Sequence, residues 1–127
     1  LDNLDDEGYK NITLVAHSLG ASMATYYLSQ TDTNAVDSVV IIGMGAGNAF
    51  SKNIESLAKV GIPVLDLYGS QDLESVLNSV EQRAAAGKKQ PGRQYRQVRV
   101  EGANHFFQGH EDALLRNVIE WLEAQQN

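Results

Sequence analysis

The fold of this chain is decided by residues 12–28, which read ITLVAHSLGASMATYYL. Residues 12–15 form a run of β-branched and apolar residues, which predicts a short buried strand. Residues 22–28 then show helical spacing of apolar side chains, with no loop between strand and helix. Ser18 therefore lies on a sharp turn, where we expect a strained backbone and a hydroxyl group exposed at the N-terminus of the helix.

Small residues flank this serine at the two positions where the strand and the helix must pass close together. They are Ala16 and Gly20, so the local pattern is A-x-S-x-G. The usual pattern at such a turn is G-x-S-x-G, and alanine at the first position meets the same steric requirement.

Length and composition restrict the classes of protein that need to be considered. The 127 residues suit one domain with one core, over residues 1–127. The net charge of −6 argues against a nucleic-acid partner, and no apolar run approaches the roughly 20 residues of a membrane span. The chain lacks cysteine, which excludes disulfides and a cysteine nucleophile. It starts at Leu1 without a signal peptide, and we expect it to be a piece of a longer protein.

Further strands and helices alternate along the rest of the chain. Strands are predicted at residues 39–42, 64–69 and 95–100, and helices at residues 50–60, 72–86 and 111–123. In the last strand, Val98 and Val100 should face inward while Gln97 and Arg99 face water, as at the edge of a sheet. The alternation predicts a four-stranded parallel sheet flanked by helices, an α/β layer protein with right-handed crossovers.

Three side chains with complementary chemistry follow the ends of three predicted strands. Ser18 follows the first strand, Asp72 follows the third in YGSQD, and His105 follows the fourth in GANHF. The carboxyl ends of parallel strands meet at one edge of the sheet, so these side chains can converge there. A serine hydroxyl needs a base to become nucleophilic, and that base needs an orienting acid. The sequence therefore predicts a Ser18–Asp72–His105 triad.

These three segments, in this order, resemble the nucleophile, acid and histidine loops of the α/β hydrolases. The chain resembles the C-terminal half of that fold and, more specifically, a bacterial α/β-hydrolase-like family of unknown function. The resemblance implies that Ser18 attacks a carbonyl carbon, that His105 moves the proton, and that Asp72 orients His105. It also implies that the backbone N–H of Leu19 donates to the oxyanion and that His17 packs beside the site or lines it.

The same resemblance bears on ligands, partners and location. It implies a small-molecule ester or acyl substrate, and a bacterial, envelope-associated parent protein. No metal-ligand spacing links the histidines, so neither a metal nor a cofactor is expected.

Each member of the triad has an alternative role. Ser18 and Asp72 are both suited to helix N-caps, and Asp72 can serve as cap and acid together. Asp66 is a second acid, but it lies within a predicted strand, where a buried and paired carboxylate is expected. His110 is a second base, but its place at the start of the last helix predicts a surface role. His105 itself can be an ordinary loop histidine.

The resemblance also predicts what this chain does not supply. The strands that precede the nucleophile turn in a complete hydrolase are expected to be missing, together with the loop that donates the second oxyanion N–H. The strand at residues 12–15 then becomes an edge. We expect it to pair with a second copy of the chain or with the missing N-terminal half.

Basic residues gather near the predicted edge strand. The six are Arg83, Lys88, Lys89, Arg93, Arg96 and Arg99. A charged edge that discourages strand addition explains them, and a site for an anionic partner is the alternative.

The leading functional prediction is a serine hydrolase of the carboxylesterase or acyl-transfer type. The alternative is a catalytically silent hydrolase-like domain that acts in binding or envelope organisation. A third and weaker alternative is a nucleotide-binding module at residues 43–47, where the spacing is G-x-G-x-G instead of the dinucleotide-binding G-x-G-x-x-G.

Overall fold

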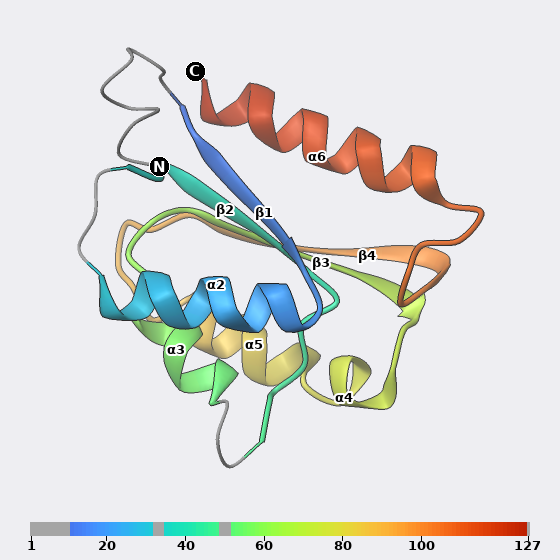
Figure 1. Cartoon of the computed structure of the whole chain (residues 1–127), viewed down its shortest axis with the longest axis horizontal. Coiled ribbons are helices and arrows are strands. Elements are labelled where there is room, and N and C mark those ends of the chain that lie inside the picture. The colour runs from blue at the N-terminus through green and yellow to red at the C-terminus, as the bar shows by residue number, and fades with distance from the viewer. Residues whose placement is uncertain (1–10, 32–34, 49–51, 127) are drawn as a thin grey trace.

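The computed structural model describes residues 11–31, 35–48 and 52–126, which form a parallel sheet covered by helices on both faces (Figure 1). The strands are β1 (Thr13–His17), β2 (Ser38–Ile42), β3 (Val64–Gln71) and β4 (Tyr95–Asn104), in the spatial order β1-β2-β3-β4. All three strand pairs are parallel, so each connection is a crossover that carries at least one helix. The predicted parallel α/β architecture is confirmed.

The helices divide between the two faces of the sheet (Figure 1). One face carries α2 (Leu19–Gln30), α3 (Asn53–Lys59), α4 (Glu74–Leu77) and α5 (Val80–Gly87), and the other carries α6 (Glu111–Gln125). All of β2 is buried: Val39 and Ile41 belong to the core under α2 and α3, and Val40 and Ile42 pack with Trp121 of α6. This continuous burial is typical of a central parallel strand. Of the helices that the structure describes, none is long and apolar enough to cross a membrane.

The helix predicted over residues 72–86 is wrong in one respect, because a turn divides it into α4 and α5. The Ser79 hydroxyl donates to the carbonyl oxygens of Ser75 at 2.9 Å and Val76 at 3.1 Å. The Arg83 guanidinium also donates to the Val76 carbonyl, at 2.7 Å. Side chains thus donate to carbonyl groups to which only backbone N–H groups would donate in a continuous helix. The first residues of the helix predicted at 50–60 lie outside the described residues, and α3 begins at Asn53.

The prediction of a wet face on β4 is also wrong in part. Val98 and Val100 pack inward as predicted, and Arg99 is exposed. Gln97 is half-buried, because α5 covers this face and the Gln97 amide donates to Asp66 at 3.2 Å and to the Val80 carbonyl at 3.0 Å.

The basic residues near β4 do not form one surface patch. Arg83 is fully buried against Asp66, and Arg93 donates to the backbone carbonyls of two neighbouring segments. Arg96 lies over the Trp121 ring at 5.5 Å. Burial lowers the pKa of the Arg93 guanidinium. Arg83 and Arg93 therefore hold parts of the fold together, whereas Lys88, Lys89 and Arg99 are exposed, and the alternative of an anionic partner stays a prediction.

Strand β1 forms one edge of the sheet. Among the residues that the structure describes, it pairs with β2 alone, and Val15 at its centre is 47% exposed. The edge position agrees with the prediction, whereas a partner along this edge stays a prediction.

Candidate active site

Ser18 connects β1 to α2 through an unusual backbone conformation. Its φ and ψ angles are 58° and −120°, those of the first central residue of a type II′ turn, a position dominated by glycine. Three backbone hydrogen bonds hold the turn: the Ser18 N–H donates to the Ile42 carbonyl at 2.8 Å, and the Ser18 carbonyl accepts from the N–H groups of Ala21 at 3.0 Å and Ser22 at 3.2 Å. Ser18 occupies the N-cap position of α2, but its side chain makes no capping hydrogen bond. The hydroxyl is therefore directed elsewhere.

The small residues around this turn are not equally constrained. Ala16 packs against the buried core under α2. A Cβ atom at Gly20 would meet no atom within 4 Å outside the backbone of its own helix. In the described part of the chain, the steric reason predicted for Gly20 is therefore not found.

Three strands deliver Ser18, Asp72 and His105 to the same edge of the sheet. The His105 Nε2 atom lies 2.9 Å from the Ser18 hydroxyl, and the His105 Nδ1 atom lies 2.6 Å from Asp72 Oδ1. His105 is 8% exposed and Asp72 is 6% exposed. An ionised carboxylate only accepts hydrogen bonds, so Nδ1 carries the proton and Nε2 is left to accept from the serine. The result is one continuous hydrogen-bonded chain across residues that are far apart in sequence.

Asp72 makes hydrogen bonds in addition to the one with His105. Its Oδ1 atom also accepts from the Leu73 N–H at 2.7 Å, and its own N–H donates to Gly69 at 3.1 Å. The N-cap position of α4 belongs to Leu73, so the predicted capping role of Asp72 is wrong by one residue. These two bonds hold the Asp72 side chain and backbone in place independently of the hydrogen bond to His105.

Gly43, which directly follows β2, makes room for this pair. Its φ angle is +63°, and a Cβ atom there would lie 3.0 Å from the His105 ring and 3.3 Å from Asp72 Oδ2. Close packing against His105 and Asp72 thus explains a glycine for which the sequence offered only the weaker nucleotide-binding alternative. The sequence did contain one signal for this role: Gly43 follows a predicted strand, as Ser18, Asp72 and His105 do.

His17 and Phe106 enclose the exposed side of the histidine. His17 Nε2 lies 2.8 Å from the His105 carbonyl oxygen, and the two rings are 4.8 Å apart. The Phe106 ring is 5.0 Å from His105, in edge-to-face contact, and 5.6 Å from His17. Phe106 is 68% exposed, and the sequence did not identify it, although it adjoins the predicted base. Both side chains therefore contact the ring of the predicted base.

The second acid lies elsewhere, as predicted. Asp66 is fully buried and pairs with Arg83 at 2.9 Å. Its Oδ2 atom also accepts from the Tyr95 hydroxyl and the Gln97 amide. Burial, and then the neighbouring Asp66, raise the pKa of Tyr95 well above its usual value. Asp66 is therefore the centre of a buried polar network beneath α5.

His110, the second base, occupies the N-cap position of α6. Its backbone carbonyl accepts from Leu114 at 3.1 Å, and the residue is half-buried. Its place at a helix start agrees with the sequence analysis.

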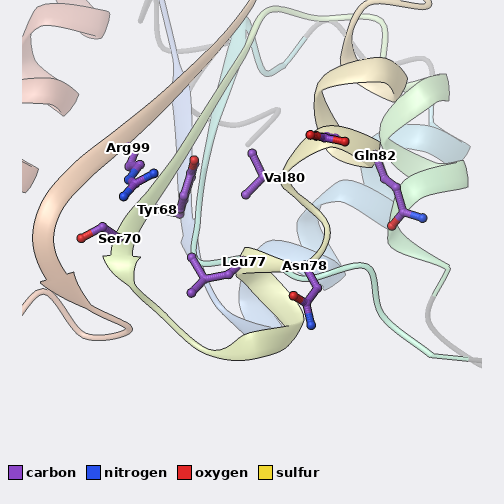
Figure 2. A pocket seen from close by; sticks show the side chains of 8 residues that line it. Tyr68, Ser70, Leu77, Asn78, Val80, Gln82 and Arg99 are labelled. Carbon is purple, nitrogen blue, oxygen red and sulfur yellow. The ribbon is translucent and has the colours of Figure 1, made fainter.

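Two hollows lie near the sheet. A cleft of about 720 Å³ separates β3 and β4 from α4 and α5, and Figure 2 shows Tyr68 and Arg99 on its sheet side with Leu77, Asn78 and Gln82 opposite. Neither Ser18, Asp72 nor His105 lines this cleft. A smaller groove of about 390 Å³ runs between α2 and α3 and begins at Leu19, the residue after the serine. Of these two hollows, the smaller is therefore the one that adjoins Ser18.

Comparison with solved structures identifies the fold. A candidate α/β hydrolase of unknown function from Agrobacterium tumefaciens matches with a TM-score of 0.78 and 24% identity, over 93% of this chain and 52% of that one. The α/β hydrolase MGS-MChE2, from the metagenome of sediments from the Mar Chica lagoon, matches with a TM-score of 0.73 and 18% identity, over 99% and 67%.

A dienelactone hydrolase from Anabaena variabilis gives a TM-score of 0.72 at 20% identity, over 94% of this chain and 52% of that one. At these identities the likeness shows the fold, and the chain spans about half to two thirds of the length of these proteins. The predicted resemblance to α/β hydrolases is confirmed.

The search of curated proteins found no match. The family model described as "protein of unknown function (DUF3530)" matches residues 1–124, and the chain therefore belongs to the DUF3530 family, with an α/β-hydrolase-like fold.

Proposed function

We propose that this chain carries the catalytic centre of a serine hydrolase of the carboxylesterase or acyl-hydrolase type. The observation that carries the proposal is the continuous hydrogen-bonded chain from the Ser18 hydroxyl through His105 to Asp72. A nucleophile, a base and an orienting acid in this geometry make up the apparatus of acyl transfer by serine.

In the first step, the Ser18 Oγ atom forms a bond to the carbonyl carbon of the substrate while its proton passes to His105 Nε2. The carbonyl π electrons move to oxygen, which becomes an oxyanion. Leu19 begins α2, so its N–H has no acceptor within the helix and lies at the positive end of the helix dipole. We assign this N–H as one oxyanion donor.

In the second step, the tetrahedral intermediate collapses and the bond to the leaving alcohol breaks, with the alcohol taking the proton from His105. Water then attacks the acyl-serine by the same route, and the acid product leaves. Asp72 keeps the Nδ1 proton of His105 in place and stabilises the imidazolium that forms in each half-reaction. The burial of both side chains strengthens this interaction.

The comparisons support the proposal at the level of the fold. The structural neighbours are named as hydrolases, one of them as a dienelactone hydrolase, and their names point to small-molecule substrates. The proposal for this chain rests on its own residues.

The test is hydrolysis of p-nitrophenyl acetate by the protein at its full natural length. We expect Ser18→Ala and His105→Ala to lower kcat by about 10³-fold or more, because the triad acts as a unit. Ser29→Ala and His110→Ala are matched controls, since Ser29 lies at the far end of α2 and His110 at the start of α6. Turnover that survives loss of the Ser18 hydroxyl would refute the proposal. A folded protein that hydrolyses no ester would favour the silent, ligand-binding alternative.

A further inference from the structure

The groove between α2 and α3 has a wall of apolar side chains that begins at the nucleophile. Leu19, Met23 and Tyr26 all line it, and they are 69%, 65% and 61% exposed. Their positions are i, i+4 and i+7 on α2, so they form one stripe along the helix. At 1.5 Å per residue, the stripe is about 10 Å long.

An apolar stripe of this kind needs an explanation, because large exposed apolar side chains are usually scattered singly. The core under α2 is formed by other residues of the helix, namely Ala21, Thr25 and Leu28. The stripe therefore does not contribute to the buried core of the sheet. Its groove has a volume of about 390 Å³, within the range of small-molecule sites.

Part of the polar wall of the groove is already satisfied, whereas Lys52, which also lines the groove, is exposed. The Asn53 side chain is 4% exposed and donates to the Ser22 hydroxyl at 2.8 Å and to the Gly45 carbonyl at 3.0 Å. Because these groups bond to each other, they have little to offer a polar ligand. The apolar stripe of Leu19, Met23 and Tyr26 is thus the surface that a hydrocarbon would contact, with Lys52 as the charged group in the lining.

The groove begins beside Ser18, so a hydrocarbon bound there would lie next to the proposed nucleophile. Leu19 lines the groove, follows Ser18 directly and supplies the N–H assigned above to the oxyanion. A substrate whose carbonyl carbon lies at the Ser18 hydroxyl can extend its chain past Leu19 and along the stripe. The hydrocarbon that fits here is therefore one covalently attached to the reacting carbonyl.

We propose that this groove binds the acyl chain of a fatty-acyl ester, and that it sets a preference for acyl chains longer than acetyl. This inference rests on the proposed function, whose substrate class it narrows. Each buried methylene group is expected to raise kcat/KM about fourfold, the equivalent of about 0.8 kcal/mol.

The test compares p-nitrophenyl acetate, butyrate and octanoate, which share one leaving group. Octanoate has six more methylene groups than acetate, and burial of about two of them already corresponds to a tenfold rise in kcat/KM, which is the smallest rise that we expect. Met23→Gln should reduce the octanoate-to-acetate ratio about fivefold or more. Tyr27→Gln is the control, because Tyr27 is a half-exposed residue of α2 that does not line the groove. An equal ratio in the wild type and in Met23→Gln, or no dependence on chain length, would overturn the proposal.

A second measurement does not depend on turnover. Decanoate binding to Ser18→Ala, followed by titration calorimetry, should be weakened when Met23→Gln is added and should persist when Tyr27→Gln is added. Undetectable binding to Ser18→Ala, or equal affinity in all three variants, would overturn the groove assignment. Hydrolysis of acetate without a chain-length preference would overturn only the assignment of the groove to the acyl chain. Decanoate binding that is weakened by Met23→Gln, in a protein that hydrolyses no ester, would refute only the proposed hydrolase function.

Discussion

Replacing Ser18 by glycine is expected to stabilise the protein relative to replacing it by alanine, although both changes remove the same hydroxyl group. The reason is the backbone of Ser18, whose φ of 58° and ψ of −120° are unfavourable for any residue with a Cβ atom. Alanine keeps this strain and glycine relieves it. Both variants lose the hydrogen bond to His105, so that loss cancels in the comparison.

The magnitude follows from two opposing terms. A non-glycine residue in such a conformation costs about 1–3 kcal/mol. Glycine loses more conformational entropy on folding than alanine, which costs about 0.5–1 kcal/mol. We therefore expect Ser18→Gly to be more stable than Ser18→Ala by about 1 kcal/mol.

Urea unfolding of the two variants at full length measures this difference. With a denaturant slope of about 1–3 kcal/mol per molar, a difference of 1 kcal/mol moves the unfolding midpoint by roughly 0.3–1 M. Ser29 provides the matched control, because it lies within α2 and the same two substitutions should there have the opposite order, with alanine more stable by about 0.5–1 kcal/mol. If Ser18→Ala proved as stable as Ser18→Gly, the strain assigned to this turn would be wrong.

Arg83→Met is expected to lower the free energy of unfolding by about 3–5 kcal/mol, because it leaves the buried Asp66 carboxylate without its cation. A loss below about 1 kcal/mol in urea unfolding would contradict this. Above pH 10, the protein should lose stability by about 1.4 kcal/mol per pH unit through Tyr95, because its raised pKa keeps the proton that the unfolded chain releases. Unfolding measured above pH 10 compares the wild type with Tyr95→Phe, which should lose less stability per pH unit. Equal losses in the two proteins would contradict the role assigned to Tyr95. Gly69→Ala should destabilise the sheet by about 2 kcal/mol or more, because its Cβ atom would overlap the Ala103 carbonyl; an unchanged melting temperature would show that the strands can separate there.

Much of the fold could be predicted because periodicity reports burial directly. The apolar run at residues 39–42 of β2 is buried throughout, and the alternation at β4 correctly placed Val98 and Val100. The continuous helix at residues 72–86 was wrong because its apolar spacing carries no information on side chains that bond to the backbone. Ser79 and Arg83 divide it, and both are ordinary residues in a helical pattern.

The same limit applies to the site. The order of Ser18, Asp72 and His105 at strand ends was sufficient to bring them together, since parallel strands end at one edge. Gly43 and Phe106 were missed, because their roles depend on distances between segments that are remote in sequence. Their contacts exist only once the strands are assembled.

The partner proposed for the β1 edge stays a prediction. Its strongest support is Val15, an exposed apolar residue at the centre of an edge strand.

The most direct test of the account is covalent labelling of the full-length protein with an alkyl fluorophosphonate, followed by mass spectrometry of the modified peptide. We expect one adduct, on the Ser18 Oγ atom, which is lost in Ser18→Ala, forms much more slowly in His105→Ala and is unchanged in Ser29→Ala. A folded protein that remains unlabelled, or that is labelled on another residue at the same rate in His105→Ala, would contradict the claim that Ser18, His105 and Asp72 act together as a nucleophilic centre.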